Sequence, residues 1–279
     1  MEAIIISSIL VISLFLLYYL RTKKLLYKLA DIQKKDYQAM LTYIAKIESR
    51  CAKPLEDFKL TDKLDHWVIV ISYNRPELIH TTITSIKANE PNIKVLVIDN
   101  GSDTKTIDTL IKLKQELMIN KLVLNHHKEV PQWQKSFAIS QALKLLNLES
   151  VATITIADND IQVLKPWIHD AMEIYRNFSD TKLICLMIDQ EQNAVHPTEE
   201  VRHLNDEEIL IKSSFNGAFF MLRLQDLMEL GYPPINEGIS DESVEDWYYT
   251  RQLKVRNWKV ATINRCLHLG YNTSIRESL

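Results

Sequence analysis

Short, continuous apolar runs recur along the chain from His66, and this alternation constrains the fold more than any other feature of the sequence. A segment with helical spacing follows each run, and a fully apolar run of four to eight residues is typical of a strand buried on both faces of a sheet. Alternating strands and helices form right-handed βαβ units. The sequence therefore predicts an α/β domain with a Rossmann-type, mostly parallel sheet flanked by helices. The predicted strands are residues 67–72, 94–98, 121–124 and 151–156, and the predicted helices are residues 76–87, 104–118 and 133–146.

Polar residues stand where these predicted strands end. Ser72 to Arg75, Asp99 with Asn100, Asn125 to His127, and Asp158 to Asp160 each follow an apolar run. Ligands of such sheets bind beyond the carboxyl ends of the strands. An ordinary polar surface explains any one cluster, but carboxylates gathered at one edge repel each other unless a cation or ligand compensates them. We expect a ligand site there.

Composition narrows the function classes. The chain of 279 residues carries 33 basic and 36 acidic side chains, a formal charge of −3. This balance gives no support to a nucleic-acid partner. The three cysteines lie far apart, which makes a structural zinc site or a disulfide framework improbable. The five glycines cannot form a G-x-G-x-x-G or Walker A motif.

Five motifs, in this order and approximate spacing, resemble the GT-A-fold glycosyltransferases, in particular the inverting enzymes of family 2. The resemblance covers about residues 66–272, and two places depart from it. Residues 131–138 lack the usual glycine- and asparagine-rich form, and Gly231-Tyr232 replaces a Gly-Gly-Phe turn. The matching segments are Val68–Pro76, Val95–Asp103, Ile156–Ile161, Asn216–Phe219 and Val244–Trp247.

Asp158-Asn159-Asp160 looks like the D-x-D motif of that family. Carboxylates at positions i and i+2 can reach one cation, and hard oxygen ligands suit Mg²⁺ or Mn²⁺. The resemblance implies that Asp160 is the direct ligand and that Asp158 faces the ribose or nucleotide as well as the metal. His268 falls where many relatives carry a histidine, as a third ligand or a phosphate contact, although a structural role is an equal alternative.

The resemblance also implies a nucleotide-sugar donor, with UDP-sugar preferred. Asp99 matches the position that accepts a hydrogen bond from the base, such as a uracil N3–H. Ser72 and Tyr73 would line the base pocket, and Lys135 resembles a basic residue of the donor site. The residues expected to bind the donor are Ser72, Tyr73, Asn74, Arg75, Asp99, Lys135, Asp158 and Asn159.

Asp246 is the expected general base, which would deprotonate the acceptor hydroxyl, and Glu245 would orient the acceptor. A plain acidic helix start is the alternative for this pair. The acceptor would be a glycan, a lipid-linked molecule or a protein. Other interpretations are a retaining transferase or an inactive, membrane-tethered scaffold. A sugar-1-phosphate nucleotidyltransferase is disfavoured because its glycine-rich loop is absent.

The first twenty residues predict a transmembrane anchor, since residues 3–20 contain no charged side chain. Arg21, Lys23, Lys24 and Lys28 follow this run, and the positive-inside rule then places the rest of the chain in the cytoplasm. Two N-x-S sequons are the only hint of the alternative, a lumenal Golgi-like location. Residues 21–65 read as a helical stalk and linker that packs on the next domain or pairs with a second copy in a homodimer. The predicted glycosyltransferase domain occupies residues 66–279.

Overall fold

The computed structural model describes residues 65–125, 135–146, 150–187, 196–231 and 244–269, with only the backbone described for residues 244–247. The chain divides into two compact units, Met1–Lys59 and Leu60–Leu279, and every described residue belongs to the second. The predicted anchor (residues 1–20) and almost all of the stalk (residues 21–65) lie outside the described residues. Within the described ranges, no helix is long and apolar enough to cross a membrane.

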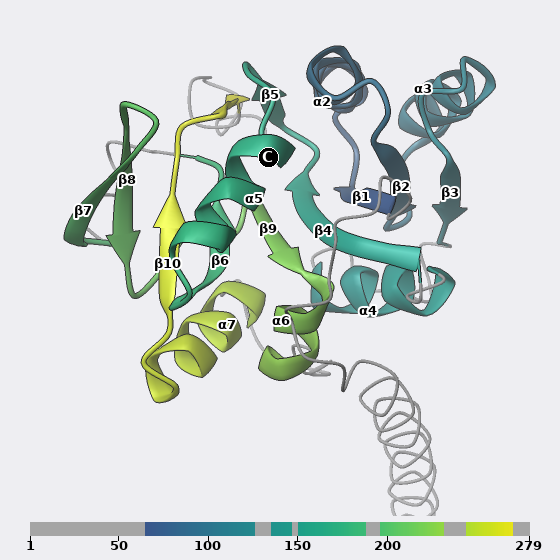
Figure 1. Cartoon of the computed structure of the whole chain (residues 1–279). Coiled ribbons are helices and arrows are strands. Elements are labelled where there is room, and N and C mark those ends of the chain that lie inside the picture. The colour runs from purple at the N-terminus through teal and green to yellow at the C-terminus, as the bar shows by residue number, and fades with distance from the viewer. Residues whose placement is uncertain (1–64, 126–134, 147–149, 188–195, 232–243, 270–279) are drawn as a thin grey trace, which may run out of the picture. The chain divides into compact units, whose positions relative to one another are not determined.

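A nine-stranded mixed sheet forms the centre of the domain (Figure 1). Its strand order is β3-β2-β1-β4-β9-β6-β10-β8-β7. The four strands predicted from apolar runs are all present, and β1 pairs in parallel with both β2 and β4, while β2 pairs in parallel with β3. These strands are β1 (Asp65–Ser72), β2 (Lys94–Asp99), β3 (Lys121–Leu124) and β4 (Val151–Asp158).

The other half of the sheet contains two reversed strands. β9 lies between β4 and β6 and is antiparallel to both, and β8 is antiparallel to its neighbours β10 and β7. All other strands of this sheet run in one direction, so the predicted mostly parallel sheet is confirmed with these two exceptions. The strands are β6 (Thr181–Cys185), β7 (Thr198–Leu204), β8 (Glu207–Lys212), β9 (Phe219–Arg223) and β10 (Lys259–Thr262).

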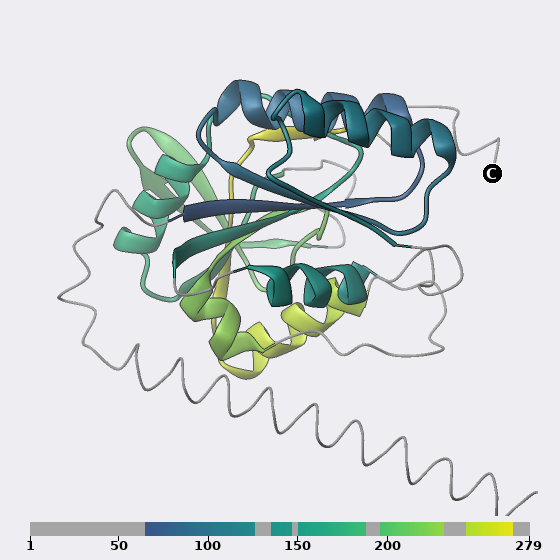
Figure 2. The same ribbon diagram turned by 90° about the vertical axis from the view of Figure 1, so that its right-hand side faces the viewer.

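Helices cover both faces of the sheet, and Figure 2 shows α2 and α3 on one face with α4, α6 and α7 on the other. The three predicted helices correspond to α2, α3 and α4. In α3 the side chain of Asp103 caps the helix by accepting a hydrogen bond from the backbone N–H of Thr106. The helices are α2 (Pro76–Asn89), α3 (Thr104–Gln115), α4 (Lys135–Leu145), α5 (Ile168–Asn177), α6 (Leu224–Leu230) and α7 (Val244–Val255).

The core follows from the same apolar runs. Val68, Ile69 and Val70 of β1 are completely buried, as expected for a strand with neighbours on both sides and helices on both faces. On α2, Ile79, Ile83 and Ile86 recur at three- and four-residue steps and are also fully buried. Each buried aliphatic side chain stabilises the fold by about 1.5–3 kcal/mol.

A second, two-stranded sheet lies beside the carboxyl end of β4. It consists of β5 (Ile161–Val163) and β11 (Cys266–His268), which are antiparallel. His268 stands opposite Ile161, so this pairing brings a residue from near the end of the chain next to Asp160.

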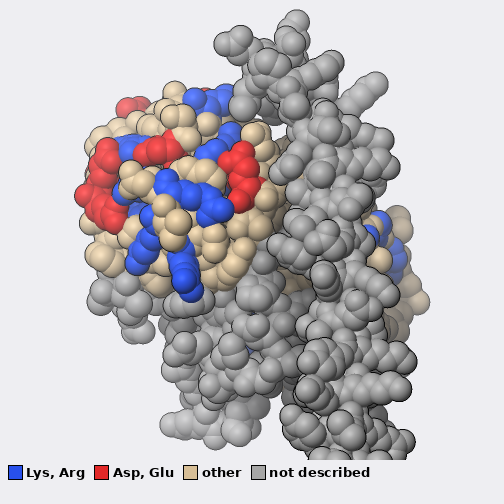
Figure 3. Space-filling view, turned by 90° about the horizontal axis from the view of Figure 1, so that it is seen from below, with Lys and Arg blue, Asp and Glu red and all other residues tan. Residues whose placement is uncertain are grey.

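Charged side chains of both signs are interspersed over the described part of the face seen in Figure 3.

Candidate active site

The carboxylates after β4 and the imidazole at the end of β11 form one cluster. Donor atoms of Asp158, Asp160 and His268 all lie within 4.8 Å of one another. Asp158 ends β4, and Asp160 directly precedes β5, which pairs with β11. The backbone N–H of Leu269 also donates to the carbonyl of Asp160 at 2.7 Å, which fixes β11 against this turn. The structure thus brings together the three residues that were predicted to bind a metal.

Basic side chains surround the two carboxylates. Arg75 Nη1 lies 2.5 Å from Asp160 Oδ2, and Lys135 Nζ lies 2.6 Å from Asp158 Oδ1. His268 Nε2 lies 3.2 Å from Asp160 Oδ1. These contacts explain how two carboxylates remain side by side at one sheet edge, since each has an opposite charge against it.

Asp160 keeps its negative charge in spite of its burial. The side chain is 6% exposed. Burial by itself would raise the pKa of Asp160, but the contact with the His268 imidazole, followed by the charges of Arg75 and Lys135, lowers the pKa below its ordinary value. A deprotonated carboxylate is the form that binds cations.

The cluster fits a divalent cation. Two carboxylates and an imidazole suit Mn²⁺ or Mg²⁺, with the imidazole favouring the softer Mn²⁺. Asp160 Oδ1 is buried and accepts no well-aligned hydrogen bond from a described residue, although His268 Nε2 touches it. A buried oxygen in this condition is a natural ligand atom.

The loop between β1 and α2 is strained where it reaches this cluster. Asn74 and Arg75 have φ angles of 51° and 62°, in the left-handed region. Non-glycine residues rarely adopt this conformation, and a residue before proline favours extended backbone, yet Arg75 precedes Pro76. The backbone N–H of Asn74 donates to Ser102 Oγ at 2.7 Å, and its side-chain Oδ1 accepts from the N–H of Asp103 at 3.0 Å. Strain of this kind persists where surrounding contacts impose it, and it is concentrated at functional sites.

Asn159 connects the same loop to the cluster. Its side-chain amide donates to the carbonyls of Tyr73 and Asn74, both at 3.1 Å. Asn159 is 7% exposed. The middle residue of the Asp-Asn-Asp segment therefore holds the loop that presents Arg75 to Asp160.

Asp99 ends β2, and Ser72 lies beside it at the end of β1, the strand between β2 and β4. Asp99 is fully buried, and its Oδ1 accepts from the backbone N–H groups of Gly101 and Ser102 at 3.1 and 2.9 Å. Its Oδ2 accepts from the Ser102 hydroxyl. Ser72 is also fully buried, and its carbonyl accepts from Asn100. Both carboxylate oxygens of Asp99 thus accept hydrogen bonds within the turn after β2. The contact of Asp99 with a nucleotide base remains a prediction.

Ser102 is a site residue that the sequence reasoning missed. Its hydroxyl donates to Asp99 and accepts from Asn74, and so it joins the turn after β2 to the strained loop. The Asp-Asn-Gly-Ser segment signals a turn, but no local pattern shows that its serine reaches a loop nearly thirty residues away.

Lys135, at the start of α4, spans two segments. Besides Asp158, its Nζ contacts the carbonyl of Gly217 at 2.7 Å. The N–H of Asp158 donates to the carbonyl of Ala218 at 2.8 Å. These bonds attach the segment that leads into β9, one of the family-like motifs, to the carboxylate cluster.

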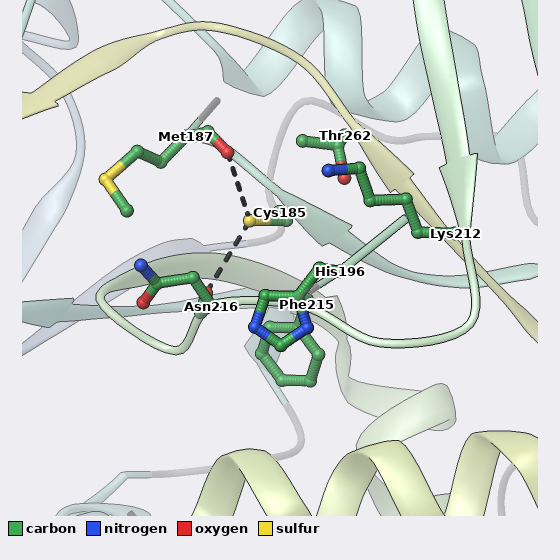
Figure 4. A pocket seen from close by; sticks show the side chains of 7 residues that line it. All are labelled: Cys185, Met187, His196, Lys212, Phe215, Asn216 and Thr262. Carbon is green, nitrogen blue, oxygen red and sulfur yellow. Dashed lines mark hydrogen bonds between the residues drawn. The ribbon is translucent and has the colours of Figure 1, made fainter. Parts of the chain in front are cut away.

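A small pocket lies near this segment, at the ends of β6, β8 and β10 (Figure 4). The pocket has room for about one water molecule and is too small for a sugar. The Cys185 thiol contacts the carbonyls of Met187 and Asn216 at 3.4 and 3.6 Å. Burial lowers the pKa of Lys212. The residues that line the pocket are Cys185, Met187, His196, Lys212, Phe215, Asn216 and Thr262.

Glu245 and Asp246 lie in the first turn of α7, and their side chains are outside the described residues. Farther along α7, Tyr249 is fully buried and packs on Phe220, with ring centroids 5.9 Å apart. Tyr248 Oη donates to the carbonyl of Leu230 at 3.1 Å. The helix that carries the predicted base is thus fixed to the core, and the catalytic roles of Glu245 and Asp246 remain predictions.

Comparison with solved structures shows the same fold. The mannosyltransferase PcManGT from Pyrobaculum calidifontis, solved in complex with GDP-Man and Mn²⁺, is 16% identical with a TM-score of 0.56, over 87% of this chain and 68% of that chain. Residues 1–349 of S. aureus TarS are 16% identical with a TM-score of 0.51, over 73% of this chain and 60% of that chain. The same part of TarS was also solved in complex with UDP. At these identities the likeness shows the fold alone.

No curated protein matches the chain. The family model described as "Glycosyl transferase family 2" matches residues 67–228, more than half of the chain. The matched range includes the strained loop and the carboxylates Asp158 and Asp160, whereas His268 lies outside it. Together with the GT-A-type neighbours, this match confirms the resemblance found in the sequence: the chain belongs to glycosyl transferase family 2 and is a glycosyltransferase.

Proposed function

We propose that this glycosyltransferase is metal-dependent and moves a sugar from a nucleotide-sugar donor, preferentially a UDP-sugar, to an acceptor hydroxyl with inversion. The observation that carries the proposal is the convergence of Asp158, Asp160 and His268 within 4.8 Å, with Arg75 and Lys135 against the carboxylates. A diphosphate group is bound by a cation and by basic side chains. This edge of the sheet supplies three ligands for a cation, and it supplies Arg75 and Lys135 as the basic side chains.

Each side chain has a separate task in this proposal. Asp160, Asp158 and His268 would hold Mn²⁺ or Mg²⁺, and the cation would supply charge stabilisation to the diphosphate leaving group. Arg75 and Lys135 bind the diphosphate oxygens. Asp246 accepts the proton of the acceptor hydroxyl as its oxygen attacks the anomeric carbon from the face opposite the nucleotide.

The donor nucleotide is tested first by thermal shift of the full chain with UDP or GDP, each with and without Mn²⁺. A ligand that binds only the folded state stabilises it by about 2.7 kcal/mol at 100 times its Kd. We expect a Mn²⁺-dependent shift with UDP that is absent in Asp160→Asn and retained in the control Asp180→Asn, whose carboxylate pairs with Arg202 away from the cluster. A shift with GDP alone would change the donor and keep the enzyme class.

The proposed base is tested by turnover. Asp246→Asn should retain the nucleotide shift and lose sugar transfer by about 10²–10⁴-fold, since this is the usual contribution of a positioned base. The anomeric configuration of the product, read by NMR, decides between inversion and retention. Nucleotide binding without transfer to any glycan, lipid-linked or protein acceptor would favour an inactive scaffold.

We also propose that residues 1–20 anchor the enzyme, that its catalytic domain faces the cytoplasm, and that residues 21–65 form a stalk that can pair two copies. The uncharged run followed by four basic residues supports this topology. Protease digestion of membrane vesicles whose cytoplasmic side faces outward tests it. Digestion of the catalytic domain in sealed vesicles is expected, and digestion only after the vesicles are opened would show the opposite orientation.

A further inference from the structure

The Arg75 guanidinium forms an ion pair with Asp160, the carboxylate to which the proposed metal would bind. Arg75 Nη1 is 2.5 Å from Asp160 Oδ2, while the other oxygen of Asp160 faces His268 Nε2 at 3.2 Å. A divalent cation binds carboxylate oxygens at about 2.0–2.2 Å. A cation on Oδ2 would therefore replace the guanidinium, and a cation on Oδ1 would lie next to its positive charge. Either position is unfavourable while Arg75 stays in place.

The backbone holds Arg75 in this position. The left-handed conformations of Asn74 and Arg75 are fixed by hydrogen bonds from Asn159 and to Ser102. The base of the Arg75 side chain is therefore fixed, whereas the side chain itself is 39% exposed. The guanidinium can leave Asp160 by rotating its own side-chain torsions, without any change in the loop.

An incoming diphosphate offers the guanidinium a better partner. Arginine binds phosphate oxygens in a bidentate manner, and a diphosphate carries more negative charge than one carboxylate. We infer that Arg75 and the divalent cation compete for Asp160, and that a nucleoside diphosphate relieves this competition by drawing the guanidinium to itself. The inference rests on the proposed metal-dependent function of the same site.

Competition of this kind has a thermodynamic consequence. The cation alone should bind weakly, and the nucleotide should strengthen its binding by removing the positive charge from Asp160. By linkage, the cation strengthens nucleotide binding by the same factor. Removing the guanidinium should then separate the two effects: the cation alone binds more tightly, and the nucleotide alone binds more weakly.

The test is a Mn²⁺ titration of the full chain, with free Mn²⁺ read by electron paramagnetic resonance, in the presence and absence of UDP or GDP, whichever shifts the melting temperature. Arg75→Asn is the main variant, because asparagine adopts the left-handed conformation more readily than most residues and its side chain is too short to reach Asp160 as arginine does. Arg202→Gln is the matched control, since Arg202 pairs with Asp180 and Glu200 far along the chain.

Without nucleotide, Arg75→Asn should bind Mn²⁺ at least about fivefold more tightly than the wild type, which is the lower end of usual coupling between two sites. The nucleotide should strengthen Mn²⁺ binding less in this variant than in the wild type. Arg202→Gln should behave as the wild type. If Arg75→Asn melts below the assay temperature, Arg75→Gln, whose backbone preference is close to that of arginine, gives the same comparison.

Two results would overturn the inference, and they are distinguishable. If the wild type binds Mn²⁺ with nucleotide, but the Arg75 variants bind Mn²⁺ alone no more tightly than the wild type, the competition is refuted and the proposed function stands. If no variant binds Mn²⁺ under any condition, the proposed metal site fails as well.

Discussion

Gly231 ends α6 in a backbone conformation that only glycine adopts easily, with φ 84° and ψ −179°. A Cβ at this position would lie 2.7 Å from Tyr248 Oη and 3.9 Å from the ring carbon that carries it. Gly231→Ala therefore introduces backbone strain of about 1–3 kcal/mol. It also displaces the Tyr248 hydroxyl from the carbonyl of Leu230, which costs about 1 kcal/mol. We expect a loss of about 2–4 kcal/mol in the free energy of unfolding.

Tyr248→Phe separates these two contributions. In the wild-type background it should cost about 1 kcal/mol, the value of the hydrogen bond to Leu230. In the Gly231→Ala background it should cost almost nothing, because the hydrogen bond is already lost and the close contact is removed with the hydroxyl. The double-mutant cycle is measured by urea unfolding of the four proteins. Equal costs in both backgrounds, or a Gly231→Ala protein within about 0.5 kcal/mol of the wild type, would refute the reasoning.

Two further predictions concern buried charge. Asp226 is fully buried and pairs with Arg223 and Lys182. Asp226→Ala should therefore lower the free energy of unfolding, measured by guanidinium titration, by about 3 kcal/mol. A loss below about 1 kcal/mol would show that water already solvates the two cations. Burial, together with the charges of Lys212 and Lys254, lowers the pKa of His196. The unfolded chain therefore takes up a proton at higher pH than the folded chain. As a result, the wild type should lose stability as the pH falls below about 6.5. His196→Gln should remove this part of the acid sensitivity, and identical slopes of stability against pH from 7.5 to 5 in both proteins would contradict it.

The first half of the fold could be predicted from sequence because its strands are buried on both faces. β1 and β2 contain continuous apolar runs, β4 is apolar apart from two buried threonines and its last residue, and β1 pairs in parallel with both of the others. β7 shows the opposite case: most of its residues are exposed, three of the seven are charged, and it is a strand because it pairs with β8. The reversal of β9 is also invisible locally, since a buried strand has the same composition in either direction.

The site divides in the same way. Asp158 and Asp160 could be predicted to lie together because only one residue separates them in the sequence. His268 was placed near them by the family resemblance alone, and the β5–β11 pairing confirms that it lies near them. The partner of Arg75 could not be predicted from sequence. Its contact with Asp160 depends on two left-handed residues before a proline, which local preferences disfavour and which distant hydrogen bonds impose.

The pairing of β11 with β5 sets an order on the assembly of the site during synthesis. Arg75, Lys135, Asp158 and Asp160 all belong to the part of the chain that leaves the ribosome early, whereas His268 follows more than a hundred residues later. The segments that carry Arg75 and Lys135 are made before β4, so they can pack on it while β11 is still being synthesised. The carboxylates of a nascent chain thus meet their arginine and lysine first, and the imidazole arrives last. Capture of the metal by all three ligands is therefore expected only after the final strand has docked, so that a half-made chain presents a neutralised acidic cluster in place of an open chelating site.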